Sequence, residues 1–180
     1  QSVRQGNHRE ADARIDHPKT LVVPVYLCLS NLGVARFAQG VQRLKTLLRL
    51  RHLVRVQHPD AAPIRLMDFG CGDGEMLAAA KVLGMDAIGI DISATRAHAA
   101  RGAGALVLPD LATFDAKGSG KVHAVVLSQV LEHVSDPIGL LRAIAQRMVP
   151  GGILFVAVPN CSGLTTPHDF DSFHRLQPLE

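Results

Sequence analysis

The stretch from Met67 to Glu75 reads MDFGCGDGE and decides the fold. Glycine stands at every second position from 70 to 74, and an acidic residue lies on either side of the three glycines. Glycine allows a chain to turn sharply from a strand into a helix and brings backbone N–H groups close to a ligand. An apolar run at 64–69 precedes the loop and a helix-forming run at 75–83 follows it. The segment therefore predicts a strand, a glycine loop and a helix.

Four further apolar runs predict four more strands, at residues 86–91, 105–108, 122–127 and 153–158. Helices are predicted over 94–101 and 138–148, the first capped by Ser93 and the second by Asp136 and ended by Pro150-Gly151-Gly152, whereas 111–121 is predicted to be a loop. Continuous apolar strands that alternate with helices are typical of a parallel sheet covered on both faces. We therefore predict an α/β fold with a doubly wound, mostly parallel, Rossmann-like sheet.

Acidic residues end the first three predicted strands, at Asp68, Asp91 and Asp110. Ligands of doubly wound sheets bind beyond the carboxyl ends of the strands. Asp91 follows the glycine loop by about 20 residues, the place from which an acid accepts hydrogen bonds from ribose hydroxyls. The predicted ligand is therefore a nucleoside or a nucleotide.

The charge of the glycine loop distinguishes between two kinds of ligand. Dinucleotide sites use G-x-G-x-x-G, whereas this loop reads G-C-G-D-G-E. Asp73 and Glu75 place two negative charges where a pyrophosphate would lie, and the repulsion grows as the site excludes water. A ligand with a cationic amine and a sulfonium fits this acidic loop better.

Five motifs in order carry a family resemblance. They are DFGCGDG (68–74), GIDIS (89–93), LPD (108–110), LSQVLEHVSDP (127–137) and PGGILFVAVPN (150–160). Together they resemble the class I S-adenosylmethionine (SAM)-dependent methyltransferases. LEHV and PGG are most similar to the subgroup that contains ubiquinone-biosynthesis O-methyltransferases and other small-molecule methyltransferases. The resemblance covers residues 64–160.

The resemblance implies a site for SAM, with S-adenosylhomocysteine (SAH) as the cofactor product. The methionyl end would contact Asp68 and the loop residues Gly70, Cys71, Gly72 and Gly74. The adenosine would contact Asp91 at the ribose, Ile92 on the adenine ring, and Asp110 with Leu111 at the adenine amino group. Ser128 and Gln129 would line the methionyl side near the reactive methyl.

Structural roles compete with several of these assignments. The glycines can serve the turn alone, Cys71 fits a small packing residue better than a nucleophile, and Asp110 can be a turn residue after Pro109. His133 is the candidate catalytic residue, because it can take a proton from a substrate hydroxyl; a hydrogen bond within its loop is the alternative. A sulfonium is already a strong methyl donor, so positioning of the acceptor can suffice.

No metal site is predicted. In the ubiquinone-type enzymes that the chain resembles, the region of Gln129 reads E-x-L-E-H, and the carboxylates and His can bind a divalent metal. Here Gln129 replaces the first Glu, which removes a hard oxygen anion. The segment HDFDSFH at 168–174 holds four potential ligands, but we interpret it as a solvated loop or part of the substrate rim.

The positive charge of the chain is concentrated near its beginning. The formal net charge is +3, and residues 1–59 hold 10 Lys and Arg against three acids. One or two helices are predicted over 32–57, and the basic part, 36–55, contains no acid. A helical cap over the substrate mouth is the favoured interpretation, and peripheral contact with anionic membrane lipids is the second. Nucleic-acid binding is disfavoured by the scarcity of aromatic residues.

We divide the chain into an N-terminal tail and basic helical cap (1–62), a SAM-binding Rossmann-like domain (63–160) and the start of an incomplete substrate region (161–180). The family's usual sheet has seven strands, and no strand-long apolar run follows Val158. We therefore expect this chain to lack the last two strands, either because they lie beyond residue 180 or because the fold is reduced. The exposed edge strand would favour a homodimer. Three widely spaced cysteines predict a reducing, cytoplasmic location.

These features predict an enzyme, a class I SAM-dependent methyltransferase that acts on a small-molecule acceptor, most simply at oxygen. Two alternatives stay open. A Rossmann-type NAD(P)-binding oxidoreductase would use the same strand–loop–helix unit, although the glycine spacing and the acidic loop oppose it. A non-catalytic, methyltransferase-like binding module would account for Gln129 and for the short carboxyl-terminal region.

Overall fold

The computed structural model of the protein describes residues 21–24, 35–102 and 104–159. Strands and helices alternate along these residues. The elements are β1 (Leu21–Pro24), α1 (Ala35–Gln57), β2 (Arg65–Phe69), α2 (Glu75–Val82), β3 (Asp86–Ile90), α3 (Ala94–Gly102), β4 (Leu106–Leu108), α4 (Leu111–Ala116), β5 (Val122–Ser128), the 3₁₀ turn η1 (Leu131–His133), α5 (Pro137–Ala145) and β6 (Met148–Ala157).

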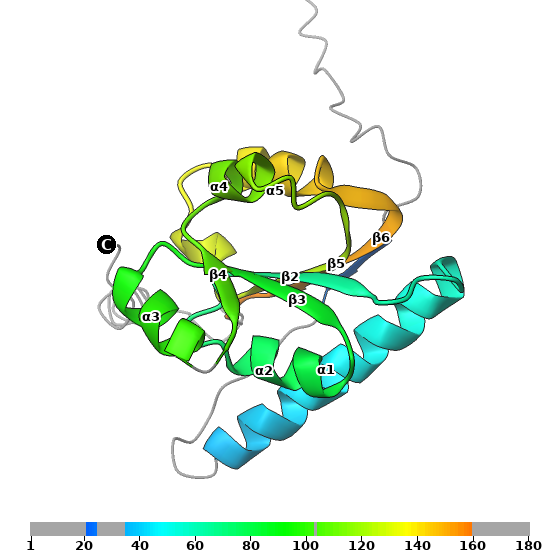
Figure 1. Ribbon diagram of the computed structural model, residues 1–180, viewed down its shortest axis with the longest axis horizontal. Helices are drawn as coiled ribbons and strands as arrows, with labels where there is room; N and C mark the ends of the chain where they lie inside the picture. Colours follow the sequence, from blue (N-terminus) through cyan, green and yellow to red (C-terminus); the bar gives the residue numbers. More distant parts are fainter. Residues whose placement is uncertain (1–20, 25–34, 103, 160–180) are drawn as a thin grey trace, which may run out of the picture.

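The strands form one parallel sheet in the order β1-β6-β5-β2-β3-β4. The chain runs outward from β2 through β3 to β4 and then returns to β5 on the other side of β2, so the topology switches between β2 and β5. Figure 1 shows α1, α2 and α3 on one face of the sheet and α4 and α5 on the other. The predicted doubly wound α/β fold is confirmed, and the glycine loop leaves β2 at the switch point, where such folds bind ligands.

Apolar side chains of the sheet pack against helices on both faces. On one face Leu66 of β2 lies in a buried cluster with Leu47 and Val54 of α1. On the other, Met67 lies in a cluster with Phe114 of α4. Successive side chains of a strand alternate between faces, so neighbouring residues of β2 enter different clusters. This double anchoring fixes the strand that carries Asp68.

Two predicted elements are wrong. Residues 111–116 form α4 instead of a loop, because the backbone N–H of Thr113 donates to Asp110 Oδ1 at 2.6 Å and caps the helix. Pro150-Gly151-Gly152 lies inside β6 instead of ending the preceding helix, which stops at Ala145. An irregularity of register between β5 and β6 accommodates this insertion, as a bulge does in other sheets.

The edge of β6 is covered, contrary to the expectation of an exposed edge strand. Strand β1 pairs with it in parallel, from Leu21 opposite Ile153 to Pro24 opposite Val156. The backbone of β6 is therefore paired over these four residues, and within the described residues β1 takes the edge position of the sheet. Residues 160–180 lie outside the described residues, so the absence of the last two family strands stays a prediction, as does the homodimer.

Helix α1 belongs to the helical layer that covers the sheet. Leu47, Leu50 and Val54 are buried in the cluster that also holds β2, β5 and β6 residues. Three other apolar residues of the helix, Val41, Leu44 and Leu48, are 38–45% exposed. One continuous core therefore crosses the predicted boundary at residues 62 and 63, and the three-part division stays a prediction. None of the described helices is long and apolar enough to cross a membrane.

Candidate functional site

The carboxyl ends of β2 and β5 enclose a cavity of about 310 Å³. Both strands are adjacent in the sheet, with Phe69 opposite Leu127, so the loops that follow them meet at one edge. The cavity lining combines the glycine loop with the end of β5 and one residue of α1: Arg43, Asp68, Gly70, Cys71, Gly72, Asp73, Glu75, Met76, Ser128 and Gln129. Six of the predicted cofactor residues are thus brought together in one cavity.

The glycine loop requires glycine at its two ends. Gly70 and Gly74 have φ angles of 79° and 80°, in the left-handed region that disfavours other residues. A Cβ at position 70 would lie 2.4 Å from Val130 Cγ2, and one at position 74 would lie 2.7 Å from Ala100 Cβ. The loop therefore passes close to both the β5 loop and α3.

Backbone hydrogen bonds join the glycine loop to the end of β3. Gly70 and Cys71 both donate their N–H groups to the carbonyl of Ile90, at 2.7 and 3.1 Å. The N–H of Gly72 donates to Asp91 Oδ2 at 2.7 Å, and the N–H of Ser93 donates to Asp91 Oδ1 at 2.8 Å. Asp91, only 9% exposed, thus holds two loops in place, a role that its position in the sequence did not reveal.

Asp68 is the buried charge of the cavity. The residue is 4% exposed, and burial raises its pKa from 3.8 to about 7, with Arg43 lowering it and Asp91 raising it further. Arg43 also forms an ion pair with Glu75. The cavity therefore has a carboxylate that is poorly solvated and a guanidinium beside it, which together can receive a zwitterion.

Arg43 is the site residue that the sequence analysis missed. It lies on α1, 25 positions before Asp68, and was counted there only as one cation of the basic segment. Arg43 precedes Leu47 by four residues and Leu50 by seven, so the three lie on one face of the helix. Because Leu47 and Leu50 pack against the sheet, this spacing could have predicted that Arg43 lies on the side of the sheet. The basic helix therefore reaches the cavity with one side chain.

Gln129 has a strained backbone at the cavity wall. Its φ is 58°, in the left-handed region, although it is not glycine. Its N–H donates to the carbonyl of Ala157 at 2.8 Å, which holds the residue at the junction of β5 and β6. Such strain in a non-glycine residue is concentrated at functional sites, and Ser128 beside it lines the same cavity.

The residues predicted at the adenosine end lie along the same edge of the sheet but outside the lining of the cavity. Ile92 follows Asp91 and is 87% exposed. Asp110 is the exposed N-cap of α4, and the hydrogen bond from Thr113 lowers its pKa. Leu111 packs partly against the cluster around Phe114. Because Asp110 caps α4, it has the kind of structural role that the sequence analysis gave as the alternative. A contact between Asp110 and the adenine stays a prediction.

Cys71 is a packing residue. Its side chain lies in a buried cluster with Leu77 and Val107, and a Cβ on Gly89 would approach its Sγ to 2.5 Å. Burial, followed by the charges of Asp68 and Asp91, raises its pKa to about 12. A thiol with such a pKa is a poor nucleophile.

His133 and Glu132 occupy η1, immediately after the cavity wall. His133 is exposed and its N–H donates to the carbonyl of Val130 at 2.9 Å. Its catalytic role stays a prediction. Within the described residues no three side chains of His, Cys, Asp or Glu gather as a metal site would require, and the segment 168–174 lies outside them.

Comparisons with known proteins identify the family of the chain. The profile of a family described as "Methyltransferase domain" matches residues 38–177. A ubiquinone biosynthesis O-methyltransferase from Xanthomonas oryzae pv. oryzae (strain PXO99A) is 33% identical over 108 residues, which cover 56% of this chain and 45% of that protein. The corresponding enzyme of Caulobacter vibrioides is 36% identical over 104 residues, or 54% and 41% of the two chains. The chain thus spans less than half the length of these relatives.

Solved structures show the same fold. The plantazolicin methyltransferase BpumL, in complex with a pentazolic desmethylPZN analogue and SAH, has a TM-score of 0.59 at 19% identity, with 78% of this chain and 60% of that one covered. The sugar N-methyltransferase KedS8 from Streptoalloteichus has a TM-score of 0.54 at 25% identity, with 79% and 60% covered. Since the family profile spans more than three quarters of the chain, from α1 to beyond β6, the chain belongs to the methyltransferase domain family.

Proposed function

We propose that the chain binds SAM at the carboxyl edge of its sheet and transfers the methyl group to a small-molecule acceptor, at oxygen. The observation that carries the proposal is that buried Asp68 and Arg43 both line a cavity of about 310 Å³ beside the glycine loop. SAM presents an ammonium and a carboxylate at its methionyl end, and the cavity offers one group of opposite charge for each.

The hydrogen bonds of the loop favour SAM over a dinucleotide. A phosphate needs free backbone N–H donors, but those of Gly70, Cys71 and Gly72 are already used by Ile90 and Asp91. The loop residues would therefore offer the methionyl ammonium carbonyl oxygens in place of N–H groups. Asp73 and Glu75 add negative charge to the rim, which repels a pyrophosphate.

The adenosine would extend from the cavity along the ends of β3 and β4. Asp91 retains lone pairs for ribose hydroxyls besides its two backbone donors. Exposed Ile92 offers an apolar surface for the adenine ring. Asp110 has Oδ1 engaged by the cap, and its other oxygen would accept from the adenine amino group with Leu111 beside it.

Oxygen as the acceptor atom rests on the names of the relatives. The curated relatives from Xanthomonas and Caulobacter are named O-methyltransferases, whereas KedS8 is a sugar N-methyltransferase. In the transfer, the acceptor would lie in line with the carbon–sulfur bond of SAM, and alignment supplies most of the rate enhancement. Ser128 and Gln129 would form the wall beside the reactive methyl.

Calorimetric titration of the chain with SAH, SAM and NAD tests the proposal. We expect SAH and SAM to bind and NAD not to compete. Arg43→Ala and Asp68→Asn should each weaken SAH binding, since each removes one partner of the methionyl zwitterion. A folded protein that binds neither SAH nor SAM would refute the proposed function, and binding of NAD alone would favour the oxidoreductase.

A further inference from the structure

An ion pair between α1 and α2 lies at the cavity. The guanidinium of Arg43 on α1 pairs with the carboxylate of Glu75 on α2, and both residues line the cavity together with Asp68. Glu75 is the first residue of α2 and directly follows Gly74, the last glycine of the loop. The cation that the proposed function assigns to the cofactor carboxylate is therefore already engaged by a carboxylate of the protein itself.

The packing of the two helices holds this ion pair at the cavity. Helices α1 and α2 lie side by side on one face of the sheet (Figure 1). Met76 and Ala79 of α2 pack against the buried cluster that contains Leu47 of α1. The backbone on either side of the pair is thus anchored, and a change of partner at Arg43 needs only side-chain movement.

The two charged side chains themselves are accessible to an entering ligand. The side chain of Arg43 is 32% exposed and that of Glu75 is 62% exposed. Ion pairs that are partly solvated contribute little to stability, so Glu75 can be displaced at low cost. A guanidinium binds a carboxylate best when two parallel N–H groups donate to its two oxygens. A second carboxylate at Arg43 therefore competes with Glu75 for the same donors.

We propose that Glu75 is a positioning residue that competes with the methionyl carboxylate of the cofactor for Arg43. This inference rests on the proposed function. In the free protein, Glu75 holds the guanidinium at the cavity. When the cofactor enters, its carboxylate replaces Glu75 at Arg43, and the Glu75 side chain turns toward solvent. Because one pair is broken as the other forms, the cofactor gains less affinity from Arg43 than it would gain from an unengaged arginine.

The proposal distinguishes ligands by a single group. SAH carries an ammonium and a carboxylate on the chain attached to its sulfur. In 5′-methylthioadenosine a methyl group replaces that chain, so this ligand keeps the adenosine and the thioether but has no carboxylate to compete for Arg43. The competition should therefore lower the affinity for SAH and leave the affinity for 5′-methylthioadenosine unaffected.

The test compares Glu75→Gln with Asp73→Asn in the full chain by calorimetry. Both changes remove one negative charge from the cavity lining, but Asp73, unlike Glu75, forms no ion pair among the described residues. Glu75→Gln should bind SAH about fivefold more tightly than wild type, because it frees Arg43 from an exposed ion pair. Asp73→Asn should bind SAH no more tightly than wild type, since it only removes attraction for the ammonium. Neither change should alter the affinity for 5′-methylthioadenosine.

A double variant shows whether the effect acts through Arg43. In an Arg43→Ala background, Glu75→Gln should no longer increase the affinity for SAH. A gain that persists without Arg43, or an equal gain from Asp73→Asn, would overturn the inference in favour of a general effect of charge. Unchanged or weaker SAH binding by Glu75→Gln would also overturn it, as would tighter binding of 5′-methylthioadenosine. A wild type that binds neither SAH nor SAM would instead refute the proposed function.

Discussion

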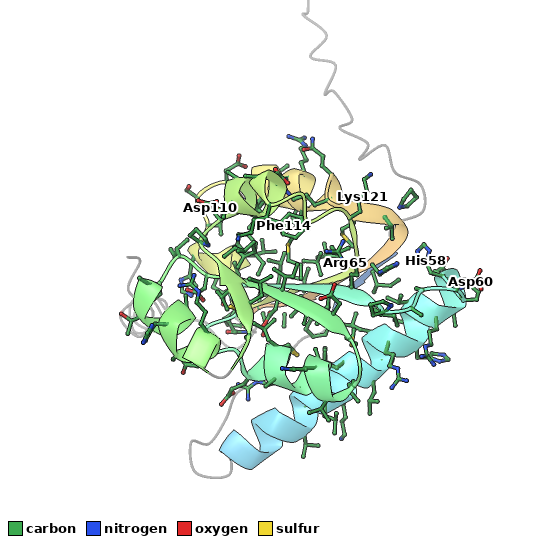
Figure 2. All side chains as sticks on the ribbon, viewed as in Figure 1. His58, Asp60, Arg65, Asp110, Phe114 and Lys121 are labelled. Atoms are coloured by element: carbon green, nitrogen blue, oxygen red, sulfur yellow. The ribbon has the colours of Figure 1, made fainter. Side chains whose placement is uncertain are left out.

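Charged residues have different surroundings at the amino edge and at the carboxyl edge of the sheet. At the amino edge, Arg65 donates to Asp86 at 3.2 Å and to the carbonyl of Lys121 at 3.1 Å, and its N–H donates to His123 at 3.0 Å. At the carboxyl edge, Asp68 is buried beside a cavity and, within the described residues, no donor hydrogen-bonds to its carboxylate. In Figure 2, His58 lies toward the right of the view and Asp110 toward the left, with Arg65 between them on the side of His58.

The difference indicates where the fold is prepared for a ligand. Pairs such as Arg65 and Asp86 are partly exposed and contribute little to stability. A buried acid whose pKa is raised by burial is destabilising when it is ionised, and such acids are concentrated at functional sites. Substitutions of acidic residues at the two edges can therefore distinguish effects on ligand binding from effects on the free energy of unfolding.

The largest effect is expected for Asp68→Asn on the stability of the ligand-free protein. Because the folded pKa of about 7 lies above the ordinary 3.8, this group's contribution is fully present below pH 3.8 and is lost as the pH rises through 7. At pH 8 the substitution should stabilise the protein by up to about 4 kcal/mol. Denaturant unfolding at pH 5 and pH 8 measures this. Asp86→Asn, at the amino edge, should show no comparable gain.

Asp91→Ala should give the next largest effect, on cofactor binding. It removes the acceptor of two loop N–H groups together with the proposed ribose contact. We expect SAH affinity to fall about 100-fold, or roughly 3 kcal/mol. Asp86→Ala, at the opposite end of the same strand, is the matched control for calorimetry. Equal affinity of the two variants would contradict the assignment of Asp91.

Gly70→Ala should destabilise the fold by about 2 kcal/mol, since strain in the left-handed region costs roughly 1–2 kcal/mol and the new Cβ would meet Val130. Gly118 has a φ of 62°, but a Cβ added there would have no atom within 4 Å, so Gly118→Ala should cost only the strain. Chemical denaturation of both variants isolates the cost of the close contact. An equal loss of stability in the two variants would mean that Val130 moves away from the new Cβ at little cost.

Asp68 should also make cofactor binding depend on pH. A SAM or SAH ammonium favours the ionised carboxylate, so binding below the pKa of about 7 must release a proton. The apparent dissociation constant for SAH should rise about tenfold between pH 8 and pH 6, and Asp68→Asn should abolish the change. Titrations in two buffers of different ionisation enthalpy count the released proton. A pH-independent affinity of the wild type would argue against contact between Asp68 and the ammonium.

The sequence predicted the parts of this molecule that depend on local signals. Apolar runs and the glycine loop defined the β2–α2 unit and the sheet, because their patterns reflect burial on both faces. It misplaced α4, since the N-cap function of Asp110 was interpreted as a turn, and it missed β1, which forms only by pairing with distant β6. Arg43 could not be assigned to the cavity, because its position depends on how α1 packs against the sheet.

The smallest effect is expected at the amino edge, from His123. Burial, with the charges of His58 and Arg65, lowers its pKa below 6.5, and the His58 ring lies 5.6 Å away. The unfolded chain therefore binds the proton more readily, so stability is present above pH 6.5 and is lost as the pH falls toward the lowered pKa. Because the ring is partly solvated, we expect only about 0.5 kcal/mol between pH 7 and pH 5. His123→Asn keeps an acceptor near the position of Nδ1, and it should reduce the loss of stability between pH 7 and pH 5 in denaturant unfolding. The exposed control His52→Asn should leave this loss unchanged. If His123→Asn also leaves it unchanged, another group causes the acid sensitivity of the amino edge.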